Sequence, residues 1–214
     1  MKIEIWSDIA CPFCYIGKHN LELAIKKMDY EGQVEIIWRS YILDHALPDI
    51  PVSGLKESLA LRKGLTVNQV NEMTAQVENM AQNAGLFLNF NAVQPVSTLN
   101  AHKLLQLAKN TGLGSQAKER LFKAYFVEGK NIADKSVLNQ LGLEIGITGS
   151  LLTEVWNNVS VSEHLNVDLY EAQTIGISGV PYFLIDRKYA ISGAQPVEFF
   201  INALRSISEK NSQK

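Results

Sequence analysis

The 214-residue sequence lacks the features that mark membrane-spanning or nucleic-acid-binding proteins. No segment approaches the ~18 continuous apolar residues that a membrane-spanning helix needs, so we expect no membrane partner. The formal net charge is −2, and the longest basic cluster is the pair Lys26-Lys27. Because binding to backbone phosphates needs a concentrated basic face, we also expect no nucleic-acid partner.

The sequence has few cysteines, and its first residues are expected to form a strand rather than a leader. The first residues, MKIEIW, alternate polar and apolar side chains from position 2, which is typical of a strand. They leave no room for a charged region, an apolar region and a cleavage site, so we expect a cytoplasmic protein. Structural disulfides are rare in a reducing compartment. The two cysteines therefore point to catalysis or metal binding.

Both cysteines lie in SDIACPFCYIGK, residues 7–18, directly after the first predicted strand. Pro12 is preferred at the first position of a helix, which makes Cys11 the capping residue. Its sulfur should face unpaired N–H groups at the positive end of the helix dipole, so we expect a Cys11 pKa below the usual ~8.5. Cys14 follows one turn later, within reach of a disulfide. Cys11 would then attack a substrate disulfide and Cys14 would resolve the mixed disulfide.

Three other interpretations compete with a redox pair. A zinc site needs two further ligands, and the four histidines show no metal-ligand spacing, so we expect no metal site. A structural disulfide is disfavoured by the reducing compartment. Two buried, inert thiols are disfavoured by the position of the pair at a proline-opened helix. The histidines concerned, treated as surface or satisfied core residues, are His19, His45, His102 and His164.

Strand signals occur only towards the two ends of the chain. Residues 2–6 and 34–43 predict strands on either side of a helix, which indicates a parallel βαβ unit. Proline and glycine interrupt residues 44–54, and residues 53–175 show almost only helical periodicity. Residues 179–186 and 188–193 predict a hairpin, and a last helix begins at Pro196. This order predicts one α/β domain assembled from both ends of the chain, with a helical insertion.

The whole pattern resembles the DsbA-like branch of the thioredoxin superfamily, and within it the FrnE-type cytoplasmic oxidoreductases. The resemblance lies in SDIACPFCYIGK, TLNAHKL, LFKAYFVEGKNI and GVPYFLIDRKYAISGAQP, which together span residues 7–196. It implies a discontinuous thioredoxin-like domain at residues 1–48 and 160–214. An all-helical domain would be inserted at residues 49–159.

The resemblance also implies roles for individual residues. Cys11 becomes the nucleophile, Cys14 the resolving cysteine and Pro181 a cis-proline beside them. Val180 should offer its backbone N–H and C=O to an extended peptide or to glutathione. The Pro12-Phe13 dipeptide should tune the pair, and Phe13, where DsbA usually has histidine, predicts a milder oxidant. The expected enzyme is a thiol-disulfide oxidoreductase acting on a disulfide-containing protein or a small thiol.

A second branch of the superfamily supplies the main alternative function. The 2-hydroxychromene-2-carboxylate isomerases and kappa-class glutathione transferases bind glutathione against the cis-proline, but typically keep serine at the position of Cys11. By resemblance to these enzymes, Asn100 and Gln195 become candidate ligand contacts. We expect no tightly bound cofactor, with glutathione as a candidate co-substrate. A non-catalytic binding or chaperone role and a homodimer formed through the helical insertion both stay open.

Overall fold

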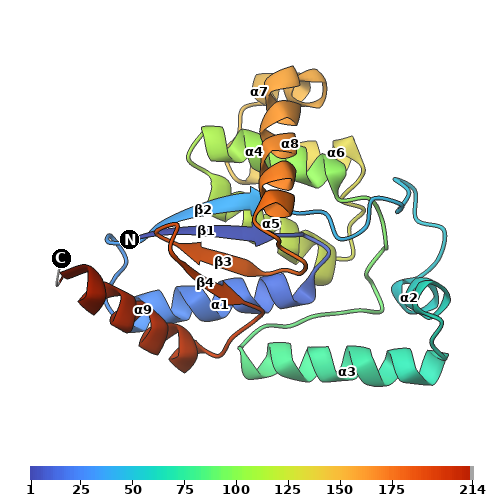
Figure 1. The fold of residues 1–214 in the computed structure, drawn as a ribbon. Coiled ribbons are helices and arrows are strands. Elements are labelled where there is room, and N and C mark those ends of the chain that lie inside the picture. Colours follow the sequence, from blue (N-terminus) through green and yellow to red (C-terminus); the bar gives the residue numbers. More distant parts are fainter. Residues whose placement is uncertain (213–214) are drawn as a thin grey trace.

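The computed structural model describes residues 1–212, and its centre is a sheet of four strands in the order β2-β1-β3-β4 (Figure 1). β1 (Lys2–Ser7) pairs in parallel with β2 (Glu35–Ser40), and α1 (Pro12–Lys27) connects them. β3 (Tyr182–Ile185) runs antiparallel to β1 and forms a hairpin with β4 (Tyr189–Ser192). The predicted βαβ unit and hairpin are both confirmed. The second strand is shorter than residues 34–43, because backbone pairing with β1 stops at Ser40.

Helices cover both faces of this sheet. Figure 1 places α1 and α9 (Val197–Ser212) on one face, and α4 (Leu99–Asn110), α5 (Gly114–Phe126) and α8 (Val159–Thr174) on the other. α6 (Lys135–Glu144) and α7 (Gly149–Glu154) pack further out on the α4 side. α2 (Leu55–Lys63) and α3 (Val67–Asn83) lie beside the sheet rather than over it. No described helix is both long and apolar enough to cross a membrane.

Local sequence signals explain where several helices begin and end. The Thr66 side chain accepts a hydrogen bond from the Gln69 backbone N–H, and the Gln69 side chain reaches back to the Thr66 backbone. This reciprocal capping box starts α3 at the next residue. Gly85 follows the end of α3 with a φ of 80°, a left-handed conformation that glycine adopts without steric cost.

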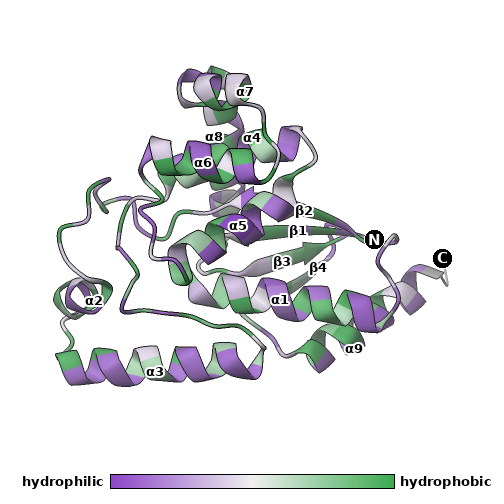
Figure 2. Cartoon of the chain, turned by 180° about the vertical axis from the view of Figure 1, so that it is seen from behind, coloured by the Kyte–Doolittle hydropathy of each residue, from purple (hydrophilic) through white to green (hydrophobic). Residues whose placement is uncertain are grey.

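One hydrophobic core connects the sheet with the helices of the central region. The same cluster of buried residues contains Ile3 and Ile5 of β1, Leu105 of α4, and Leu121 and Phe122 of α5. Figure 2 shows α3 alternating between hydrophobic and hydrophilic residues along its length. The predicted insertion is thus all-helical as expected, but its inner helices complete the core over the sheet. The proposed boundaries at residues 48/49 and 159/160 stay a prediction, and the last two residues lie outside the described part of the chain.

A buried ionic network fixes α8 and α4 to the edge of the sheet. One carboxylate oxygen of Asp168 in α8 accepts a hydrogen bond from Arg39 of β2 at 2.9 Å. The other accepts one from the Ser40 backbone N–H at 2.9 Å and one from the Gln106 amide of α4 at 2.6 Å. Asp168 is 1% exposed, and these partners satisfy its buried carboxylate. The network holds α4 and α8 against β2, the strand that pairs with β1.

Candidate active site

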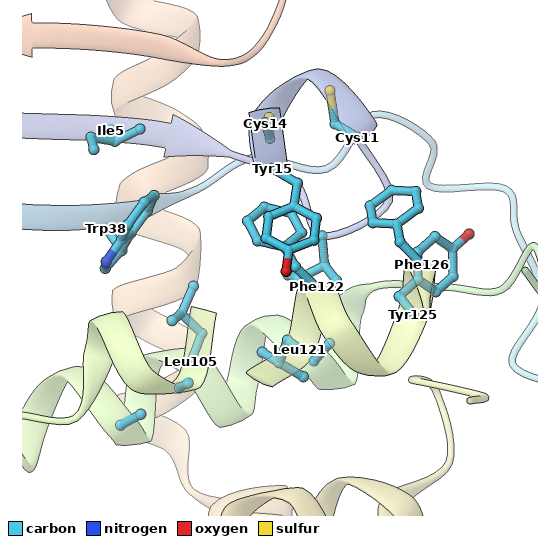
Figure 3. Packing of buried hydrophobic residues seen from close by; sticks show 14 of the residues in the cluster. Ile5, Cys11, Cys14, Tyr15, Trp38, Leu105, Leu121, Phe122, Tyr125 and Phe126 are labelled. Atoms are coloured by element: carbon cyan, nitrogen blue, oxygen red, sulfur yellow. The ribbon is translucent and has the colours of Figure 1, made fainter. Parts of the chain in front are cut away.

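The cysteine pair lies where the first strand gives way to the first helix. Cys11 is the N-cap residue of α1, Pro12 occupies the first helical turn, and the Cys14 N–H donates to the Cys11 carbonyl at 3.0 Å. Both sulfurs are free thiols, and both residues are buried, with 4% and 1% of their surface exposed. Figure 3 shows both at the start of the helix, above the aromatic rings of α5. The predicted cap position of Cys11 is confirmed.

The loop before β3 approaches Cys11 from the other end of the chain. The Cys11 thiol donates a hydrogen bond to the Val180 carbonyl oxygen at 3.4 Å. The peptide bond between Val180 and Pro181 is cis, as the resemblance implied. The fold therefore brings the loop before β3 into contact with the Cys11 sulfur, although Cys11 and Val180 are 169 positions apart in the sequence.

The pKa of Cys11 is raised well above its usual value. The largest cause is a hydrogen bond with the Cys14 sulfur, followed by burial of the Cys11 thiol. The Cys14 backbone N–H lowers the pKa by less than these effects raise it, and Cys11 makes no capping hydrogen bond through its side chain. The expected lowering of the Cys11 pKa by the helix terminus is therefore wrong. Burial and the second thiol outweigh the helix dipole.

A glycine in α1 makes room for the proline. A Cβ atom at Gly17 would lie 3.0 Å from Pro181 Cγ and 3.2 Å from the Phe183 ring. Real Cβ atoms rarely come so close to their neighbours. Gly17 therefore allows the helix that carries the cysteines to pack directly against the Val180–Pro181 loop.

A fully buried lysine interacts electrostatically with the pair. Lys118 of α5 is 0% exposed, and its Nζ donates to the Ser7 carbonyl oxygen at 3.2 Å. The same Nζ lies 5.0 Å from the Phe122 ring centroid. Burial lowers the Lys118 pKa to about 8, an effect opposed by electrostatic interactions with Cys14, Asp8 and Cys11. The cysteine pair thus has a buried cation in its immediate electrostatic environment.

Asp8 and His102 add a second buried polar pair behind the loop. His102 Nε2 lies 3.3 Å from Asp8 Oδ1, while Asp8 Oδ2 accepts from the Leu43 N–H at 2.8 Å. Burial opposes ionisation of Asp8, but the contacts with His102 and Leu43 leave its pKa lowered. Burial also lowers the pKa of His102. Near neutral pH the pair is therefore a carboxylate facing a neutral imidazole that orients the loop before Cys11.

The remaining predicted contacts occupy different environments. Phe13 is 39% exposed at the rim of the site, next to Pro12. The Asn100 side chain donates to the Ala133 carbonyl oxygen at 2.7 Å, and the Gln195 side chain donates to the Ser192 carbonyl oxygen at 2.8 Å. Both amides thus make structural hydrogen bonds. Their proposed contacts with a ligand stay predictions.

Sequence reasoning missed the contributions of Asp8, Gly17 and Lys118. One signal was available for Lys118, because it lies three and four residues before Leu121 and Phe122 and so on the apolar face of its helix. A charged residue on that face indicates a buried charge. No comparable signal existed for Gly17, because its constraint comes from a loop that is remote in sequence.

An apolar cavity of about 310 Å³ adjoins the cysteine loop. Its walls come from residues 10–13, α2, α3 and the aromatic end of α5. Among residues 1–212, no group of three or more His, Cys, Asp or Glu side chains is arranged to hold a metal ion. The site is thus a dithiol beside a cis-proline loop and an apolar cavity.

Comparison with known proteins places this geometry in a family context. The family described as DSBA-like thioredoxin domain matches residues 2–205. A probable DsbA oxidoreductase from Streptomyces coelicolor is 31% identical, with a TM-score of 0.90 over 96% of this chain and 89% of that one. The uncharacterized protein YwbO of Bacillus subtilis is 27% identical and covers 98% of both chains. The cytosolic disulfide reductase DsbM from Pseudomonas aeruginosa, solved with GSH, is 18% identical, with a TM-score of 0.69 over 98% of this chain and 100% of that one.

Proposed function

The chain belongs to the family of DSBA-like thioredoxin domains, and from that premise we propose that it is a thiol-disulfide oxidoreductase that reacts through Cys11 and Cys14. The observation that carries the proposal is the 3.4 Å contact between the Cys11 sulfur and the Val180 carbonyl oxygen, beside the cis Val180–Pro181 bond. This contact brings a thiol to a backbone edge that can pair with an extended substrate. FrnE-type activity is the form of the reaction that we favour.

The proposed reaction proceeds in two exchange steps. The Cys11 thiolate attacks one sulfur of the substrate disulfide, forming a mixed disulfide and releasing one substrate thiolate, which takes up a proton. The Cys14 thiolate then attacks the Cys11 sulfur and releases the second substrate thiol. The substrate disulfide is reduced by two electrons and the cysteine pair is oxidised to a disulfide. Two molecules of a small thiol such as glutathione would return the pair to the dithiol.

The electrostatics favour the reducing direction for this exchange. A strongly stabilised thiolate favours the dithiol form and makes a pair a strong oxidant, as in DsbA-type sites. Here burial and the Cys14 hydrogen bond raise the Cys11 pKa, and Phe13 can neither donate a hydrogen bond nor carry a charge. The reduced pair should therefore donate electrons more readily. Reduction of disulfides at the expense of glutathione in the cytoplasm is consistent with this poise.

Single-cysteine variants test the proposal directly. With hydroxyethyl disulfide as substrate and glutathione as donor, Cys11→Ser should abolish catalysed reduction. Cys14→Ser should instead accumulate the mixed disulfide at Cys11, which mass spectrometry of the intact protein detects. Full activity of Cys11→Ser would overturn the proposal. Formation of a glutathione conjugate by a variant lacking both cysteines would favour the isomerase or transferase alternative.

A further inference from the structure

The cavity beside the cysteine loop has the composition of a small-ligand site. Most of its lining is apolar, with Leu55 and Leu59 from α2, Met73 and Val77 from α3, and Phe126 from α5. Its volume of about 310 Å³ falls at the lower end of the ~300–1,000 Å³ usual for small-molecule pockets. Such a space accommodates a compact aromatic or branched aliphatic group.

The cavity reaches the reacting end of the molecule. Cys11 and Phe13 belong to its lining, and Figure 3 shows Phe126 and Tyr125 close to the turn that carries Cys11. Phe13 and Leu43, which also line it, are 39% and 50% exposed. A molecule bound there would therefore enter past exposed apolar side chains and lie next to the nucleophilic residue.

Two polar side chains without partners among residues 1–212, Lys63 and Thr98, line a cavity that adjoins this one. A second cavity of about 270 Å³ shares Leu55, Leu59 and Lys63 with the first and also includes Thr98. Its other charged residues already have partners within the chain, because Asp8 contacts His102 and the Leu43 N–H, and Asp44 pairs with Arg62. Lys63 forms no ion pair with any residue of the described chain, whereas the neighbouring Arg62 pairs with Asp44. Thr98 is 3% exposed, and its hydroxyl oxygen has no hydrogen-bond partner although Thr98 is the N-cap residue of α4.

Buried hydroxyl groups normally have hydrogen-bond partners, because an unpaired one has lost its hydrogen bonds to water without replacement. An unpaired hydroxyl and an unpaired ammonium group on the same pair of cavities indicate a ligand with an acceptor that carries negative charge. A carboxylate meets both conditions. The apolar lining and these two groups together define a ligand that is apolar at one end and anionic at the other.

We propose that the two cavities bind low-molecular-weight disulfides whose halves are aromatic or branched aliphatic and carry a carboxylate. The apolar part would lie between Cys11 and α3, and the carboxylate would pair with Lys63 and accept a hydrogen bond from Thr98. This inference rests on the proposed exchange function and names its substrate class.

Kinetics with three disulfides test the assignment. Dithiobis-nitrobenzoate is aromatic and anionic, dithiodipyridine is aromatic and neutral, and hydroxyethyl disulfide is small and neutral. In Val77→Trp, which fills the first cavity, the kcat/KM ratio of either aromatic substrate to hydroxyethyl disulfide should fall by about ten-fold. In Lys63→Gln, the ratio of dithiobis-nitrobenzoate to dithiodipyridine should fall by about three-fold, the effect of one exposed ion pair.

Matched variants on the same helices control for general effects of the substitutions. Lys56→Gln removes a lysine from α2, and Val67→Trp adds a tryptophan to the exposed start of α3, in both cases outside the two cavities. Both should retain the wild-type ratios. Unchanged ratios in Val77→Trp and Lys63→Gln would overturn the substrate class while leaving the exchange function intact.

A binding measurement separates this inference from the exchange chemistry. Naphthoate has an aromatic body and a carboxylate but no sulfur, so it can be titrated calorimetrically into a protein with both cysteines replaced by serine. If adding the Val77→Trp substitution to this protein weakens naphthoate binding by about ten-fold, the result would support the site even if no exchange activity were found. Absence of naphthoate binding, or binding that Val77→Trp does not weaken, would count against it.

Discussion

The Nζ of Lys118 lies 3.2 Å from the carbonyl oxygen of Ser7, the residue at which β1 ends and the cysteine loop begins. This contact places a positive charge from α5 at the start of the loop that carries the dithiol. The lysine is 0% exposed, and burial lowers its pKa to about 8. Such a charge is costly in an apolar interior, so its position is informative about the site.

Replacing Lys118 by methionine should stabilise the protein and slow its reaction. Lysine in the unfolded chain has a pKa of ~10.4, and the difference from the folded value of about 8 corresponds to a cost of about 3 kcal/mol at neutral pH. Methionine has a similar length and no charge, so the free energy of unfolding should rise by about 1–3 kcal/mol at pH ~7. Disulfide exchange should slow because thiolates of the pair lose a nearby cation. Urea unfolding and exchange kinetics measure both effects.

The pH dependence identifies the charge as the cause. Between pH about 8 and ~10.4 the unfolded chain holds the Lys118 proton while the folded chain releases it. As the pH rises through this window, the free energy of unfolding of the wild type should therefore increase relative to that of Lys118→Met. Below the window the difference between the two proteins should not change with pH. Lys123→Met, an exposed position on the same helix, should show neither change. A constant difference between wild type and Lys118→Met over this range would contradict a buried, titrating lysine.

Removing Cys14 should make Cys11 easier to ionise. The hydrogen bond with Cys14 is the largest cause of the raised Cys11 pKa, and Cys14→Ala removes both that bond and the electrostatic interaction between the two sulfurs. Iodoacetamide alkylates the thiolate, so the rate of Cys11 alkylation increases as the pH rises. This increase should occur at lower pH in Cys14→Ala than in the wild type. Peptide mass spectrometry assigns the modified residue. If the pH dependence of Cys11 alkylation were the same in Cys14→Ala and the wild type, burial alone would set the Cys11 pKa.

Gly17→Ala should reduce both stability and exchange rate. Alanine in a helix gains ~1 kcal/mol over glycine, but overpacking a filled site costs ~1–3 kcal/mol. The new Cβ would lie 3.0 Å from Pro181 Cγ, so a net loss of up to ~2 kcal/mol is expected. Displacement of Pro181 would also move the Val180 carbonyl away from Cys11. Thermal unfolding and exchange kinetics measure these changes.

A second glycine provides the control for this substitution. A Cβ at Gly149, in the first turn of α7, would meet no atom within 4 Å, so Gly149→Ala should leave exchange unchanged. A Gly17→Ala variant as stable and as active as the wild type would show that close packing of α1 against the Val180–Pro181 loop is not required.

The sequence by itself determined the local elements and the position of the cysteines. The alternation in residues 2–6 and the proline after Cys11 depend on neighbours a few positions away. Such signals specify where a helix or strand begins whatever the rest of the chain does. They therefore sufficed to predict the βαβ unit, the hairpin and the capping position of Cys11.

Only the tertiary structure decided the electrostatics of the site and the shape of its surroundings. The Cys11 pKa depends on burial and on the Cys14 sulfur, and these effects outweigh the local helix dipole from which a lower value was predicted. The position of Lys118 beneath Ser7 and the contact between Gly17 and Pro181 join segments that are remote in sequence. Solvent exclusion and close packing arise when these segments meet, so no local pattern could reveal them.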